Sequence, residues 1–164
     1  MGSAQGLLLN ECGWEKAGHK SVGGARQYIG QVGKSGHGQV GVFAVLSRGT
    51  SAGRGRLYLP EAWSADAARC AQARVVTARI YRSKPALAAL LVERLPDPGL
   101  VRADWVGGDV AYGNSPALWQ ALQTRGQAYV LDVGLGLQFY LADPTPASAP
   151  AWSGRGRPPR RAQP

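Results

Sequence analysis

The stretch Gly6-Leu7-Leu8-Leu9-Asn10 forms the first regular element that the sequence predicts. Three consecutive leucines between a glycine and a polar residue are typical of a short buried strand that ends in a loop. The next residues, 11–38, are rich in glycine and show no periodicity, so we expect them to form a loop. The chain therefore begins with a buried strand, and Asn10 lies at its end.

Two further strands are predicted after this loop. Residues 39–46 are apolar on both faces and rich in β-forming residues, and residues 56–59 form a similar run that Pro60 stops. A turn rich in Gly and Arg separates them, which favours a hairpin. Residues 60–82 stay open between a helix-like patch at 65–72 and a β-branched run at 75–77.

From Pro85 onward, helices and strands alternate. Leucines on one face predict a helix that begins at Pro85 and stops before Pro96; they are Leu87, Leu90, Leu91 and Leu95. Residues 101–108 then read as a strand that leads into Asp109. The order so far is three strands, a helix and a strand.

A second helix and a last strand complete the pattern. Ser115 is a typical N-cap, Pro116 suits the first turn, and Gly126 suits a left-handed C-cap. Residues 128–133 form the last predicted strand. An antiparallel meander followed by alternating helices and strands predicts an α/β fold with a mixed sheet flanked by helices.

The chain length of 164 residues favours one domain. We expect this domain to span residues 1–134. Residues 135–164 lose periodicity and become rich in Pro, Ala, Ser and Arg, so we expect a disordered tail there.

The charge balance indicates a polyanionic partner. The chain has 19 Lys and Arg against 10 Asp and Glu, a net charge of +9, which favours nucleic acid through counterion release. Composition drift in a GC-rich genome is the alternative. The N-terminus lacks a signal-peptide pattern and no apolar run is long enough to span a membrane, so we expect a cytoplasmic, nucleoid-associated protein without a membrane partner.

Two local motifs do not support chemistry. Gly33-Lys34-Ser35 fails as a phosphate-binding loop because Tyr28 stands where that loop needs its first glycine. Cys12, His19 and His37 lack a metal-ligand spacing, and Cys12 and Cys70 are too far apart in sequence to predict a zinc knuckle or a disulfide framework.

Five sequence blocks, in the same order along the chain, match the motifs of a known protein family. The first runs from Glu11-Cys12-Gly13-Trp14-Glu15-Lys16 to Ser21-Val22-Gly23-Gly24-Ala25-Arg26-Gln27-Tyr28. The others are Gly33-Lys34 with residues 39–43, residues 56–63, residues 105–113, and the Gly-Arg-Gly-Arg-Pro-Pro segment at 154–159. Together they resemble the DDE endonuclease domain of bacterial insertion-sequence transposases over nearly the whole chain.

The resemblance implies a ribonuclease-H-like fold, incomplete at its C-terminal side, and DNA strand cleavage and transfer at insertion-element ends. In that family two Asp and one Glu hold two divalent ions, with Mg²⁺ as the expected cofactor. Asp109 matches the second aspartate and is the predicted catalytic and metal-binding residue. Asn10 stands at the first acid position, beside Glu11, as a degenerate catalytic residue. The family's third acid lies beyond the segment at which this chain stops, so we expect a truncated, inactive enzyme.

The resemblance also implies DNA as a partner, together with an intact transposase or a second fragment. The predicted DNA-binding residues are Lys16, Lys20, Arg26, Arg155, Arg157, Arg160 and Arg161. Two alternatives stay open. The chain is either a DNA-binding or regulatory remnant that competes with an intact transposase, or a decayed reading frame without function.

Overall fold

The computed structural model describes residues 4–18, 20–47, 53–75, 80–94, 103–141 and 152–157. The chain divides into two compact units, residues 1–134 and 135–164. Each unit is considered by itself. The larger unit carries the sheet and the helices.

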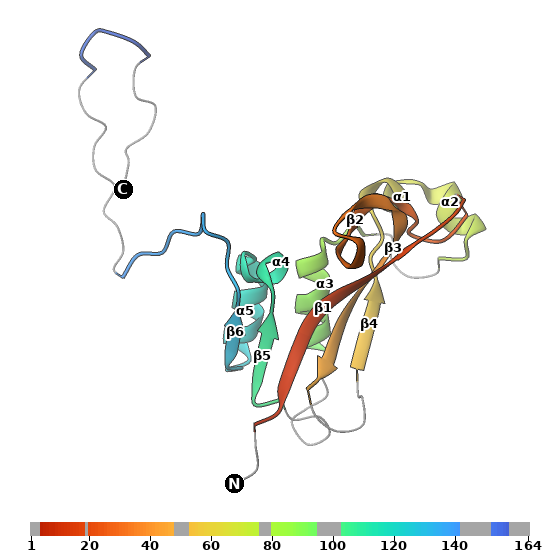
Figure 1. Ribbon diagram of the computed structural model, residues 1–164, viewed down its shortest axis with the longest axis horizontal. Coiled ribbons are helices and arrows are strands. Elements are labelled where there is room, and N and C mark those ends of the chain that lie inside the picture. Colours follow the sequence, from red (N-terminus) through yellow and green to blue (C-terminus); the bar gives the residue numbers. More distant parts are fainter. Residues whose placement is uncertain are drawn as a thin grey trace. The chain divides into compact units, whose positions relative to one another are not determined.

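A central strand, β1 (Gly6–Glu15), organises the sheet. It runs antiparallel to β3 (Lys34–Leu46) and parallel to β5 (Trp105–Gly108), which in turn runs parallel to β6 (Tyr129–Leu131). On the other edge of β3, β2 (Ala25–Ile29) pairs with its first half and β4 (Gly53–Leu57) with its second half. Within the described residues the sheet has six strands, in the order β2-β3-β1-β5-β6 with β4 beside β3 (Figure 1).

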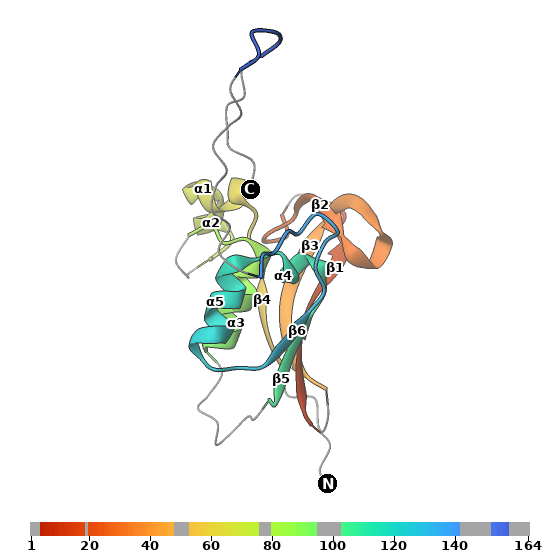
Figure 2. The ribbon, with the colours of Figure 1, turned by 90° about the vertical axis from the view of Figure 1, so that its left-hand side faces the viewer.

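Two helices pack on one face of this sheet. They are α3 (Lys84–Glu93) and α5 (Pro116–Thr124), which contact each other, and α3 also contacts β3 and β4 (Figure 2). The core between them contains Leu7, Val42 and Val106 from the strands and Leu91 and Leu118 from the helices. This architecture confirms the predicted α/β fold with a mixed sheet flanked by helices.

The burial of β1 refines the prediction of a short buried strand. Leu7 and Leu9 are buried beneath the helices, whereas Leu8, between them, is 42% exposed. Successive side chains of a strand point to opposite faces. The strand therefore has the ordinary alternation of buried and exposed side chains. The sequence does not reveal it, because the exposed position is also a leucine.

The prediction of a loop at residues 11–38 was wrong. β1 continues to Glu15, and β2, a 3₁₀ turn η1 (Gly30–Val32) and the first half of β3 fill most of the remainder. Glycines here allow neighbouring strands to approach each other closely. A Cβ at Gly38 would meet the carbonyl oxygen of Trp14 and the side chain of Ile29. Glycine-rich strands lack the apolar alternation by which strands are recognised.

The hairpin prediction is confirmed by the antiparallel pairing of β3 and β4, although β4 begins earlier than predicted. The open segment after Pro60 contains two short helices, α1 (Glu61–Ala65) and α2 (Ala67–Gln72). Buried Trp63 donates a hydrogen bond from Nε1 to the carbonyl oxygen of Gly24 at 2.9 Å. The helix-like patch therefore does form a helix, and the β-branched run at 75–77 falls largely outside the described residues.

Both predicted main helices are confirmed. Ser83 caps α3 by accepting a hydrogen bond from the Ala86 amide at 3.3 Å, and Ser115 caps α5 by accepting one from Leu118 at 3.4 Å. Gly126 has the expected left-handed conformation, with φ of 60°. A further short helix, α4 (Val110–Gly113), lies between β5 and α5 and was not predicted. Leu95, the last predicted leucine of α3, lies outside the described residues.

In the smaller unit, the described residues 152–157 form a compact turn. Trp152 donates from Nε1 to the carbonyl oxygens of Arg155 and Gly156, each at 3.2 Å. Gly154 and Gly156 have left-handed backbone conformations. Arg155 and Arg157 are exposed on this turn.

Candidate active site

The candidate site forms where β5 ends beside the middle of β1, which continues to Glu15. The prediction that Asn10 lies at the end of its strand was therefore wrong. The parallel pairing of β1 and β5 finishes with Leu9 opposite Gly108. Asn10 directly follows Leu9 and Asp109 directly follows Gly108, so this register brings the two predicted site residues side by side. The ends of parallel strands at such a position are a common place for binding sites in α/β proteins.

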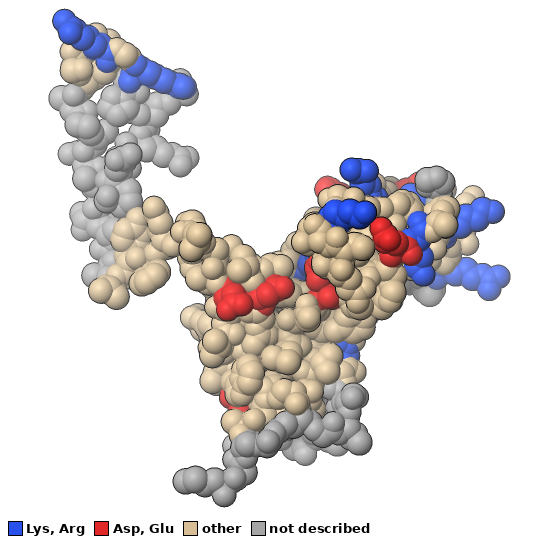
Figure 3. Space-filling view, viewed as in Figure 1, with Lys and Arg blue, Asp and Glu red and all other residues tan. Residues whose placement is uncertain are grey.

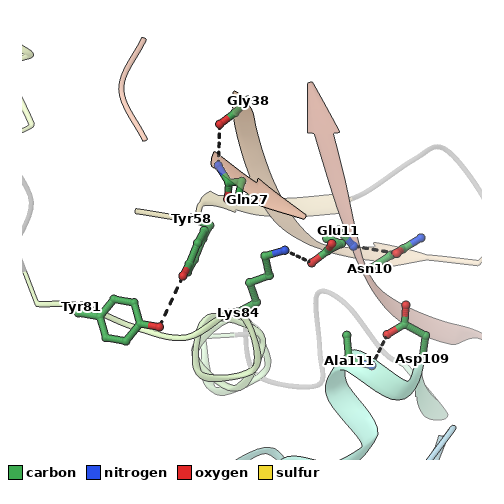
Figure 4. Close-up of polar contacts among 9 residues, drawn as sticks. All are labelled: Asn10, Glu11, Gln27, Gly38, Tyr58, Tyr81, Lys84, Asp109 and Ala111. Atoms are coloured by element: carbon green, nitrogen blue, oxygen red, sulfur yellow. Dashed lines mark hydrogen bonds and ion pairs between the residues drawn. The ribbon is translucent and has the colours of Figure 1, made fainter. Parts of the chain in front are cut away.

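Asp109 also begins the helix α4. Its Oδ1 accepts a hydrogen bond from the Ala111 amide at 2.9 Å, as an N-cap residue does. Figure 4 shows the carboxylate turned toward the strand that carries Asn10 and Glu11. Asp109 is exposed, so one of its oxygens stays available to solvent or a ligand.

Asn10 supplies no charge to the site. Its Oδ1 accepts a hydrogen bond from the Glu11 amide at 2.8 Å, and the residue is exposed. The structure thus places a neutral amide beside Asp109, where the resemblance implied an acid.

Glu11 is held by a lysine from α3. Lys84 Nζ lies 2.8 Å from Glu11 Oε2, and the side chains are only 19% and 11% exposed, respectively. Such shielding makes it costly to remove one partner, because the other charge is then left without compensation. The Lys84 ammonium group also lies 5.7 Å from the centre of the Tyr58 ring (Figure 4). Because Lys84 is the first residue of α3, the ion pair ties this helix to β1.

Two tyrosines border the ion pair. The hydroxyl groups of Tyr58 and Tyr81 lie 3.5 Å apart, and their rings meet edge to face with centres 6.4 Å apart. Burial, the hydrogen bond with Tyr81, and the charges of Tyr81 and Glu61 raise the pKa of Tyr58 to about 12. Tyr58 is therefore neutral at physiological pH and can act as a hydrogen-bond donor.

Tyr112 lies beneath the site. It is fully buried, and within the described part of the chain its hydroxyl has no hydrogen-bond partner. Burial raises the pKa of Tyr112 strongly, and the negative charges of Glu11 and Asp109 raise it further. These two carboxylates therefore act electrostatically on the same buried hydroxyl.

These residues line one open cavity of about 680 Å³, which we call the acid-site cavity. Asn10, Glu11 and Asp109 contribute to it from the sheet side. Tyr28, Tyr58, Tyr81, Ser83 and Lys84 are among its other lining residues. The cavity can thus receive a planar group against aromatic rings close to a carboxylate.

The donor set does not fit a pair of Mg²⁺ ions. Such ions need several carboxylate oxygens, but Asn10 is neutral, Lys84 balances Glu11, and one oxygen of Asp109 caps α4. Among the described residues, no group of three His, Cys, Asp or Glu side chains could hold a metal ion. Asp109 as a metal ligand stays a prediction.

Lys16, Lys20 and Arg26, the predicted DNA-binding residues of the larger unit, do not line this cavity. Lys16 and Lys20 follow β1, Arg26 lies on β2, and all three are exposed. Figure 3 shows Lys and Arg side chains gathered over the end of the sheet that carries β2, α1 and α2. In the smaller unit Arg155 and Arg157 are exposed, and Arg160 and Arg161 fall outside the described residues.

Lys84 and the tyrosines Tyr28, Tyr58 and Tyr81 were not predicted as site residues. Lys84 stands immediately before Pro85, at a predicted helix start, which signals its local structure but not its partner. A periodicity argument could not connect it with Glu11, because the contact joins distant parts of the chain.

The fold and the strand-end site define the class of protein. A mixed sheet with an aspartate at the end of β5, beside the central strand β1, is the arrangement expected of a ribonuclease-H-like nuclease domain. The chain belongs to the DDE superfamily of endonucleases, whose family model matches residues 2–164. This confirms the family resemblance and the fold. Comparison with curated proteins and with solved structures gives no significant match.

The family is related to transposases, works with divalent metal ions, and points to DNA as the substrate. Among the described residues, no helix is long and apolar enough to cross a membrane.

Proposed function

We propose that this chain is a DNA-binding domain of the insertion-sequence transposase type whose acid site, as it stands, does not cut or join DNA. The observation that carries the proposal is the placement of Asn10 beside Asp109, where the pairing of β1 with β5 ends. A neutral residue occupies the position where the family's first acid is expected. The ancestral reaction is strand cleavage and transfer at the ends of an insertion element.

The charge balance of the site supports loss of catalysis. Of the three candidate donors, only Asp109 carries a negative charge that no cation in the described residues balances, because Lys84 neutralises Glu11. An amide supplies an oxygen ligand without charge, and charge is what favours binding of a strongly hydrated divalent ion. One carboxylate does not replace the family's three acids.

Binding to DNA does not depend on these acids. The chain has a net charge of +9, and exposed Lys16, Lys20 and Arg26 lie at one end of the sheet. We propose that residues 1–134 form the ribonuclease-H-like domain and that 135–164 form a basic tail, with exposed Arg155 and Arg157. Such a chain would occupy the ends of its element and compete there with an intact transposase.

A strand-cleavage assay tests the loss of catalysis. The substrate is a DNA duplex that carries the element's terminal repeats, and the reaction contains Mg²⁺ or Mn²⁺. We expect no turnover from the wild-type chain. Turnover that is abolished by Asp109→Ala would overturn the proposal.

A metal-binding measurement tests the reason for this loss. We expect Asn10→Asp to create a pair of adjacent carboxylates, so that Mn²⁺ raises the thermal unfolding temperature of this variant. A ligand at 100 times its Kd stabilises a protein by roughly 2.7 kcal/mol. The matched control, Asn10→Asp with Asp109→Asn, keeps an N-cap residue but removes the pair. Equal stabilisation of the wild-type chain by Mn²⁺ would contradict the role given to Asn10.

A further inference from the structure

A short segment, residues 80–84, separates the acid-site cavity from a second cavity. Tyr81, Ser83 and Lys84 line the acid-site cavity, whereas Ile80 and Arg82 line the second one, of about 270 Å³. This alternation is that of an extended chain, in which successive side chains point to opposite sides. The two cavities are therefore neighbours that share one wall.

Three arginines line the second cavity, which we call the arginine cavity. Arg56 comes from β4, Arg82 precedes α3, and Arg94 follows the last turn of α3. All three are exposed. Apolar residues of β4 and α3, Leu57 and Leu87 among them, also line it. The three arginines thus border a hollow between β4 and α3.

The geometry of β4 explains why arginines gather here. Arg54 and Arg56 pair with Ala44 and Val42 of β3, which are buried on the face that α3 covers. Side chains paired across strands lie on the same face. Both arginines therefore point toward α3, and Arg54 Nη1 donates a hydrogen bond to the carbonyl oxygen of Arg94 at 2.9 Å.

The charge of this cavity is not balanced from within. No carboxylate of the described residues lines it. The ion pair of Lys84 with Glu11 belongs to the other cavity. Guanidinium groups clustered without carboxylates favour an external anion, and their planar donors suit phosphate oxygens.

We propose that the arginine cavity binds backbone phosphates of DNA. The neighbouring nucleotides of the same DNA then lie at the acid-site cavity. This inference rests on the proposed function, because it takes DNA as the ligand. It adds a phosphate site formed by Arg56, Arg82 and Arg94, distinct from the basic residues at the β2 end and in the tail. The shared wall at residues 80–84 places both contacts on one bound strand.

A salt-dependent titration tests this site. A labelled mixed-sequence DNA duplex is titrated with the full chain at several salt concentrations. The test variant is Arg56→Gln with Arg82→Gln. The matched control, Arg74→Gln with Arg125→Gln, removes the same charge from exposed residues outside the arginine cavity. Circular dichroism and thermal unfolding verify that both variants fold.

We expect the test variant to flatten the salt dependence. The slope of log affinity against log salt is negative, and each lost phosphate contact reduces its magnitude by roughly 0.9, so two lost contacts reduce it by roughly 1.8. The control should keep a slope close to that of the wild type. Test and control variants with equal slopes would overturn the arginine site and leave the proposed function standing.

Two further outcomes are decisive. If the wild-type chain fails to bind the duplex even at low salt, both the arginine site and the proposed DNA binding fall. In a parallel arm, inorganic phosphate is added during thermal unfolding at constant ionic strength. If phosphate stabilises the wild type but not the test variant, while DNA binding is the same in both, the cavity takes a free phosphate and the DNA assignment is wrong.

Discussion

The acid-site cavity and the arginine cavity lie on opposite sides of residues 80–84 and differ in how their charges are compensated. In the first, Lys84 and Glu11 neutralise each other at 2.8 Å, and a neutral Asn10 lies beside Asp109. In the second, three arginines line a hollow to which no carboxylate of the described residues contributes. The first site uses its charges for internal structure, whereas the second offers them to an external anion. This contrast supports the proposal that the molecule holds DNA and does not react with it.

The largest effect is expected from breaking the internal ion pair. Lys84→Met leaves the shielded carboxylate of Glu11 without its counter-charge and should lower the free energy of unfolding by about 3 kcal/mol. Urea denaturation measures the change. Lys84→Met combined with Glu11→Gln removes both charges and should recover most of the loss. A single variant as stable as the double variant would show that the pair contributes little to the fold.

A smaller effect of opposite sign is expected at Tyr112. Tyr112→Phe removes a fully buried hydroxyl that has no partner within the described residues, and should raise the free energy of unfolding by about 1 kcal/mol. Tyr58→Phe is the matched control, because the Tyr58 hydroxyl does have a partner in Tyr81. Destabilisation by Tyr112→Phe in the same denaturation experiment would reveal a hydrogen bond at this hydroxyl.

The smallest effect is a pH dependence from Tyr58. The pKa of Tyr58 is raised from 10.0 to about 12 in the folded chain, so the folded state keeps this proton longer than the unfolded state does. The associated stability is fully present below pH 10 and is lost as the pH rises toward 12. Unfolding of the wild type and of Tyr58→Phe across this range should therefore differ in slope, with the wild type falling more steeply. Parallel curves would contradict the shift.

Much of this fold could be predicted because local patterns specify it. The capping residues Ser83 and Ser115 and the prolines after them set the helix starts, and the apolar run before Asn10 set the first strand. Asp109 could be placed at a strand end for the same reason. The juxtaposition of Asn10 and Asp109 was implied by the family resemblance, and the register of β1 and β5 shows it.

The parts that could not be predicted depend on contacts between distant residues. The strands within residues 11–38 contain glycines that permit close strand packing, as at Gly38, and these remove the apolar alternation. The ion pair of Glu11 with Lys84 joins β1 to α3, and the two cavities arise from several elements at once. Local periodicity carries no information about such pairs.

Asp109 caps α4 through its contact with the Ala111 amide, and this has a consequence for how the residue is inherited. Loss of an N-cap costs about 1 kcal/mol, a large fraction of a small domain's stability. Selection for a folded chain alone therefore favours a capping residue such as Asp, Asn, Ser or Thr at this position, whether or not the chain cuts DNA. An acid that only binds metal has no such second role, so Asp109 is expected to persist longer than such an acid. The presence of this aspartate is therefore explained by common descent and by its role in folding, without an intact active site.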